Sequence, residues 1–240
     1  MSQQHTVRAY DQELNELRAL ISRMGGMAEA QIDAAVDALI KRDSEAAPEI
    51  VEKDKIIDDM EAEAEKLAIQ TIALRAPMAD DLRDIIAAMK ISSILERTGD
   101  YAKNIAKRTV VLSQSERIDS VVIIPQMARM VTRMLQDVID AFIERDAERV
   151  LLIRERDKEV DDLYNSLFRE LLTHMMENSR TITPATHLLF IAKNLERVGD
   201  HATNIAEIIY YSVTGKTIDP ARPKQDDTSY VDVQPPEDSE

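Results

Sequence analysis

One stretch of eleven residues occurs twice in this chain, and it requires two halves with similar folds. Residues 96–106 read Glu-Arg-Thr-Gly-Asp-Tyr-Ala-Lys-Asn-Ile-Ala, and residues 196–206 read Glu-Arg-Val-Gly-Asp-His-Ala-Thr-Asn-Ile-Ala. A second pair of segments, residues 36–59 and 139–162, is identical at 12 of 24 positions. Because both repeats occur in the same order, the sequence indicates an internal duplication.

Each half has the apolar periodicity of long helices. In the first helical segment, apolar side chains recur every three or four residues at Leu14, Leu17, Leu20, Ile21, Met24, Met27, Ile32, Ala35, Val36 and Leu39. Aromatic residues make up only 4% of the chain, which favours helices over sheets. We expect helices over residues 8–42, 45–74, 78–112, 125–144, 147–177 and 185–213.

The expected fold is therefore all-α, with two tandem three-helix bundles that cover residues 8–112 and 121–213. Residues 214–240 are rich in Pro, Asp, Gln and Ser, and they contain four of the eight prolines. This composition predicts a disordered acidic tail.

Composition also narrows the classes of function. The chain has no cysteine, which excludes disulfides and cysteine-based metal sites. Its net charge of −15 disfavours binding to nucleic acids, because these attract cationic proteins. There is no apolar run long enough to span a membrane and no apolar stretch of a signal peptide. We expect a cytoplasmic protein that contacts membranes only through partners.

Acidic pairs lie in the repeated segments. Glu96 and Asp100, and likewise Glu196 and Asp200, are one helical turn apart on one face. The preceding helix of each half has its own pair, Asp54 with Asp58 and Asp157 with Asp161. If each helix pair folds as an antiparallel hairpin, about Pro77 and about residues 178–179, each half brings four carboxylates to one height.

Four carboxylates at one height repel each other unless a cation joins them, and oxygen ligands suit Mg, Mn, Fe or Zn ions. Asn104 and Asn204 could add an amide oxygen, and Gly99 and Gly199 would permit a close approach. The alternative is a solvated acidic face that Arg97, Arg197, Lys55 and Lys158 neutralise in surface ion pairs. Equal height does not establish that the side chains face one another, so both interpretations remain open.

The two Glu-Arg-x-Gly-Asp-x-Ala-x-Asn-Ile-Ala stretches, on a duplicated three-helix plan, resemble the PhoU family. Residues 75–83 and 181–185 resemble the family at matching places. The resemblance implies a regulator of phosphate homeostasis that represses the phosphate regulon. Its implied partners are the ATPase subunit of the Pst phosphate ABC transporter, the PhoR sensor kinase and a second copy of the chain.

The resemblance also implies Fe or Zn clusters in some members. The matching candidates in this chain are Glu96, Asp100, Asn104, Glu196, Asp200 and Asn204, with Asp54, Asp58, Asp157 and Asp161 from the partner helices.

Two other functions are compatible with a helical bundle. A di-metal carboxylate oxidase would use Glu-x-x-His motifs. None of the four histidines has a glutamate three residues before it, so we expect no enzyme. A purely structural helical adaptor without metal is the second alternative.

Overall fold

The computed structural model describes residues 2–118 and 122–218, and these form six long α-helices without a strand. The elements are α1 (Ser2–Lys41), α2 (Ala46–Arg75), α3 (Asp80–Ser113), α4 (Ile123–Glu144), α5 (Arg149–Glu177), the short 3-10 helix η2 (Ser179–Thr181) and α6 (Ile182–Thr214). The predicted all-α fold with six helices is confirmed. From residue 219 onward, the predicted disordered tail lies outside the described residues.

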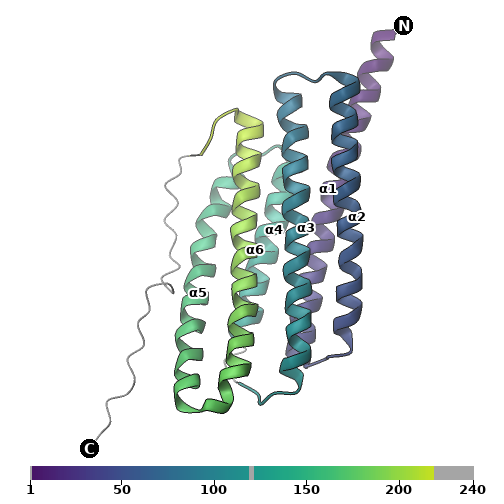
Figure 1. The fold of residues 1–240 in the computed structure, drawn as a ribbon. Helices are drawn as coiled ribbons and strands as arrows, with labels where there is room; N and C mark the ends of the chain where they lie inside the picture. The colour runs from purple at the N-terminus through teal and green to yellow at the C-terminus, as the bar shows by residue number, and fades with distance from the viewer. Residues whose placement is uncertain (1, 119–121, 219–240) are drawn as a thin grey trace, which may run out of the picture.

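The two three-helix units lie side by side along their long axes (Figure 1). Helices α1 and α3 of the first unit pack against α4 and α6 of the second, while α2 and α5 lie at opposite edges. The α2–α3 turn and the α5–α6 turn are at opposite ends of the molecule. The repeated helix pairs α2–α3 and α5–α6 therefore point in opposite directions.

The two units share one core. Buried apolar side chains from all six helices form a single contiguous cluster, which is built mainly from Ala, Leu, Ile and Val. On α2 the buried positions include the small residues Ala47, Ala64 and Ala68. Small side chains on this face let α2 approach its neighbours closely, which suits the tight packing of a protein core.

The segment 36–59 is repeated because both halves use the same turn. Arg42 and Arg145 each follow a helix in the left-handed conformation, with φ of 57° and 56°. The aspartate after each arginine caps the next helix. Asp43 Oδ1 accepts hydrogen bonds from the backbone N–H groups of Glu45 and Ala46, and Asp146 Oδ1 makes the same two bonds in the second half.

A buried carboxylate on α3 joins elements of both units. Asp84 accepts hydrogen bonds from Arg18 of α1, at 3.0 Å, and from the hydroxyl of Ser212 of α6, at 3.1 Å. It also forms an ion pair with Arg145 in the α4–α5 turn. Because Asp84 is almost fully buried, its charge depends on these partners. The contacts fix the position of the second unit on the first.

Substitutions at two neighbouring glycines of α1 can test how closely the two units pack. A methyl group at Gly25 would lie 2.7 Å from Cγ1 of Ile139 on α4, whereas at Gly26 it would meet nothing within 4 Å. Gly26→Ala should stabilise the fold by up to about 1 kcal/mol through helix propensity. Gly25→Ala should instead destabilise it by about 1–2 kcal/mol, because overpacking outweighs the same gain. Urea unfolding of both variants measures the difference, and equal stability would contradict close packing at this crossing.

Candidate functional site

One aspartate in each half is buried between the two helices of its hairpin. Asp54 on α2 and Asp157 on α5 are each only 2% exposed. A methyl group at Gly99 would lie 2.8 Å from Oδ1 of Asp54, and one at Gly199 would lie 2.7 Å from Oδ1 of Asp157. Each signature glycine therefore leaves room for a carboxylate from the facing helix.

The four predicted carboxylates of the first unit lie close enough to affect one another. Partial burial raises the pKa of Asp58, and the negative charge of Asp54 raises it further. Burial likewise raises the pKa of Glu96, with further contributions from Asp100 and Asp58. The structure therefore brings Asp54, Asp58, Glu96 and Asp100 together, with Asp58 exposed and Glu96 and Asp100 partly exposed.

A lysine of the same signature contacts this group. The ammonium of Lys103 forms ion pairs with Oδ2 of Asp54 on α2 and, at 2.5 Å, with Oδ1 of Asp100 on α3. Partial burial alone would lower the pKa of Lys103, but the hydrogen bonds to Asp100 and Asp54 raise it above its ordinary value. The lysine remains charged and compensates part of the acidic cluster.

The second unit is more enclosed. Asp157, Asp161 and Glu196 are 2%, 6% and 5% exposed, while Asp200 is partly exposed. Glu196 accepts a hydrogen bond from the ammonium of Lys193 at Oε1, 3.0 Å away. Its Oε2 atom is buried and has no hydrogen-bond partner among the described residues.

The electrostatic environment of Glu196 is unfavourable for a negative charge. Burial raises the pKa of its carboxyl group, and the charges of Asp200 and Asp161 act in the same direction, against the opposing effect of Lys193. The second unit therefore holds a buried oxygen, Oε2 of Glu196, that has no hydrogen-bond partner among the described residues and lies within the influence of Asp161 and Asp200.

The acidic residues of the two units differ in how well they suit a metal ion. Within residues 2–118 and 122–218, no three His, Asp or Glu side chains converge on a point where an ion could be held. By chemistry alone, the unpartnered oxygen of Glu196 and its acidic neighbours suit a hard divalent cation. In the first unit an ammonium already contacts two of the four carboxylates. Metal binding therefore stays a prediction.

The two candidate asparagines are placed differently from the buried carboxylates. Asn104 is exposed. Asn204 is also exposed and lines a pocket of about 510 Å³ between α3 and α6, together with Leu82, Lys90 and Tyr211. A role for either amide as a metal ligand gains no support from these positions.

Tyr101 and His201, which occupy one of the three positions at which the two signatures differ, meet between α3 and α6. The rings of Tyr101 and His201 are 5.2 Å apart, and Oγ1 of Thr98 is 3.4 Å from Nδ1 of His201. Burial lowers the pKa of His201, and the charge of Arg97 lowers it further. The sequence analysis missed this contact. The shared position of Tyr101 and His201 within the two copies is the signal that could have indicated it.

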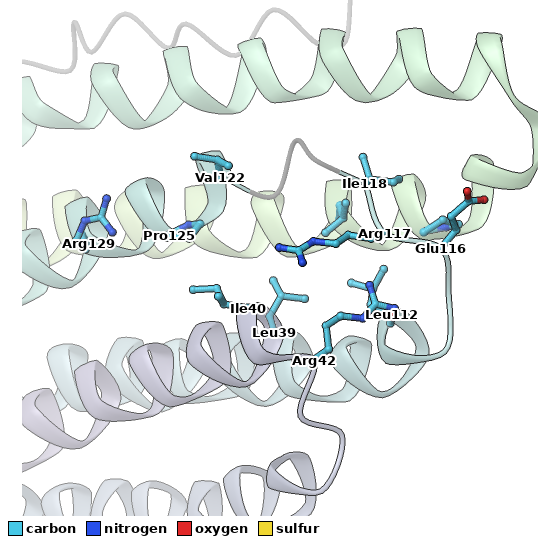
Figure 2. A pocket seen from close by; sticks show the side chains of 12 residues that line it. Leu39, Ile40, Arg42, Leu112, Glu116, Arg117, Ile118, Val122, Pro125 and Arg129 are labelled. Atoms are coloured by element: carbon cyan, nitrogen blue, oxygen red, sulfur yellow. The ribbon is translucent and has the colours of Figure 1, made fainter.

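A second pocket, of about 310 Å³, lies where α1 and α3 end and α4 and α6 begin (Figure 2). Its walls combine apolar side chains such as Leu39 and Leu188 with three arginines, Arg42, Arg117 and Arg129. Arg42 donates to the carbonyl oxygens of Leu112, Ser113 and Ser115, so it caps the end of α3. None of these residues belongs to the acidic signatures.

No helix in the described part of the chain is both long enough and apolar enough to cross a membrane.

Known proteins match this chain along most of its length. The PhoU domain family matches residues 21–109 and 124–209. A protein of Zymomonas mobilis named "Phosphate-specific transport system accessory protein PhoU homolog" is 57% identical over 212 residues, which cover 88% of this chain and 90% of that protein. A protein of the same name from Caulobacter vibrioides is 48% identical over 224 residues, 93% of this chain and 97% of its own length.

Solved structures agree. The crystal structure of PhoU from Pseudomonas aeruginosa has a TM-score of 0.83 at 38% identity, and it covers 86% of this chain and 100% of that one. The phosphate transport system regulatory protein PhoU from Streptococcus pneumoniae has a TM-score of 0.81 at 31% identity, with 88% and 99% covered. The resemblance drawn from the two signatures is confirmed, and the chain belongs to the PhoU family.

Proposed function

We propose that this protein is a non-catalytic regulator of phosphate homeostasis that acts by binding the phosphate-specific transport system. The observation that carries the proposal is the match, over nearly the full length of both chains, to relatives named as accessory proteins of that system. A protein of similar fold and known structure is likewise named a phosphate transport system regulatory protein.

More specifically, we propose that the protein represses the phosphate regulon when phosphate is plentiful. It would do so in the cytoplasm, by binding both the ATPase subunit of the Pst transporter and the PhoR sensor kinase. The arrangement of the helices supports two contacts, because α2 and α5 lie at opposite edges of the structure. We also propose a homodimer, which light scattering of the purified protein tests.

Deletion of the gene should derepress a phosphate-starvation promoter in phosphate-rich medium, and the intact gene should restore repression. A promoter fused to a reporter enzyme measures the effect, and co-purification with the tagged ATPase subunit and kinase tests the two contacts. A reporter that stays repressed after deletion contradicts the regulatory role. Oxygen consumption by the iron-loaded protein would contradict the proposal that the protein has no catalytic activity.

We further propose that the second unit binds a divalent metal ion, Fe, Zn, Mn or Mg, at Asp157, Asp161, Glu196 and Asp200. The support is the unpartnered buried oxygen of Glu196 and the neighbouring negative charges. A bound cation would neutralise these charges, and the four side chains would hold it and thereby join α5 to α6. In this proposal the ion is structural, and it stabilises the surface that partners bind.

Glu196→Gln combined with Asp200→Asn should lower the metal content of protein purified without chelator. Elemental analysis by mass spectrometry measures the metal, and the equivalent first-unit changes, Glu96→Gln with Asp100→Asn, are the matched control. Reporter repression should weaken together with the loss of metal. Full repression by a metal-free second-unit variant rules out a regulatory role for the ion, and unchanged metal content places the ion elsewhere.

The raised pKa of Glu196 gives a pH-dependent prediction for the chelated protein. Its folded pKa lies above the ordinary value of 4.5, so the ionised carboxylate destabilises the folded state as pH rises above about 4.5. Glu196→Gln removes this penalty, so the variant should have a higher Tm than the unaltered protein at pH 7–8. The difference should shrink toward pH 4. Thermal unfolding in chelator at several pH values measures it, and a lower Tm for the variant at pH 8 would contradict the assignment.

A further inference from the structure

We infer that Lys103 is the permanent counter-ion of the first-unit carboxylates and takes the place that a metal ion would otherwise fill. Its ammonium forms ion pairs with Asp54 on α2 and Asp100 on α3. The two carboxylates come from facing helices of one hairpin, so the lysine bridges α2 and α3 much as a shared metal ion would.

The chemistry of the ammonium suits this position. Lysine has a compact charge with three donors, and two of them are directed at the two carboxylates. Asp54 is 2% exposed, so its charge cannot be solvated by water and needs a protein partner. The other two carboxylates, Asp58 and Glu96, are at least partly open to solvent. Lys103 compensates Oδ2 of Asp54, while Oδ1 of the same carboxylate is buried and has no hydrogen-bond partner among the described residues.

The second unit differs at the equivalent position. Thr203 stands where the first copy has Lys103, and its buried hydroxyl donates to the carbonyl oxygen of Asp200 at 2.8 Å. The surroundings of the two signature glycines also differ. Gly99 faces the amide of Gln31, with Oε1 3.2 Å from an added methyl group, whereas Gly199 faces the apolar side chain of Val131.

The two copies of the signature have therefore diverged at the bridging cation. In the first unit the cation that bridges α2 and α3 is covalently part of the chain. We therefore expect metal uptake in the second unit and not at Asp54 and Asp100, which Lys103 already bridges. That consequence rests on the metal site proposed above, whereas the role of Lys103 does not.

The test compares Lys103→Met with Lys107→Met, an exposed lysine one turn further along the same helix. In buffer with chelator, Lys103→Met should lower the Tm by roughly 4–8 °C, because it leaves Asp54 buried without its cation. Lys107→Met should leave the Tm within about 1 °C. Titration with manganese chloride should then raise the Tm of Lys103→Met more than that of the unaltered protein.

A double variant keeps the test decisive if Lys103→Met does not fold. Asp54→Asn with Lys103→Met removes both charges, so it should fold, be more stable than Lys103→Met alone, and lose the extra response to manganese. The inference is overturned if Lys103→Met and Lys107→Met have the same Tm. It is also overturned if Asp54→Asn alone lowers the manganese stoichiometry of the otherwise unaltered protein, because the ion would then occupy the first unit.

These readouts use purified protein and do not depend on the transporter or the kinase. A failure of the regulatory proposal would appear in the promoter reporter, with the Tm shifts intact. A failure of the present inference would appear in the Tm shifts, with repression intact.

Discussion

The structure depends on burying one carboxylate between the two helices of each hairpin. Asp54 and Asp157 are nearly inaccessible to water, and each packs against a glycine of the facing helix. A side chain in place of Gly99 or Gly199 would collide with the aspartate, so the glycine and the acidic residue depend on each other. This steric dependence explains why the Gly-Asp signature and the preceding aspartates are repeated together.

The two units are joined too closely to act as separate bodies. They share one apolar core, Asp84 of α3 binds groups from α1, α6 and the α4–α5 turn, and Tyr101 contacts His201 across the α3–α6 interface. Since α3 and α6 carry both signatures, each acidic cluster lies on a helix that also forms the interface. Any displacement of α6 would therefore act directly on α3.

Much of the fold follows from the sequence, because helical periodicity and a duplicated segment specify six helices in two similar halves. The height of the carboxylates also follows, since an antiparallel hairpin pairs Asp54 with Asp100 whatever surrounds them. Spacing along one helix cannot give the direction of a side chain relative to a third helix, however. For that reason Asn204, four residues after Asp200, lies beside α3 instead of the buried carboxylates. The contact between Tyr101 and His201 was missed because it depends on packing between the halves.

A duplication starts from two equal sites. In this protein the two halves differ in how they compensate the charge of their buried carboxylates. The first unit keeps three of its carboxylates at least partly open to solvent and neutralises the buried one with Lys103. The second encloses three carboxylates and leaves an oxygen of Glu196 without a partner among the described residues. The buried Asp54 of the α2–α3 hairpin therefore has a cation supplied by the chain itself, while Glu196 of the α5–α6 hairpin pairs with Lys193 close to the charges of Asp161 and Asp200.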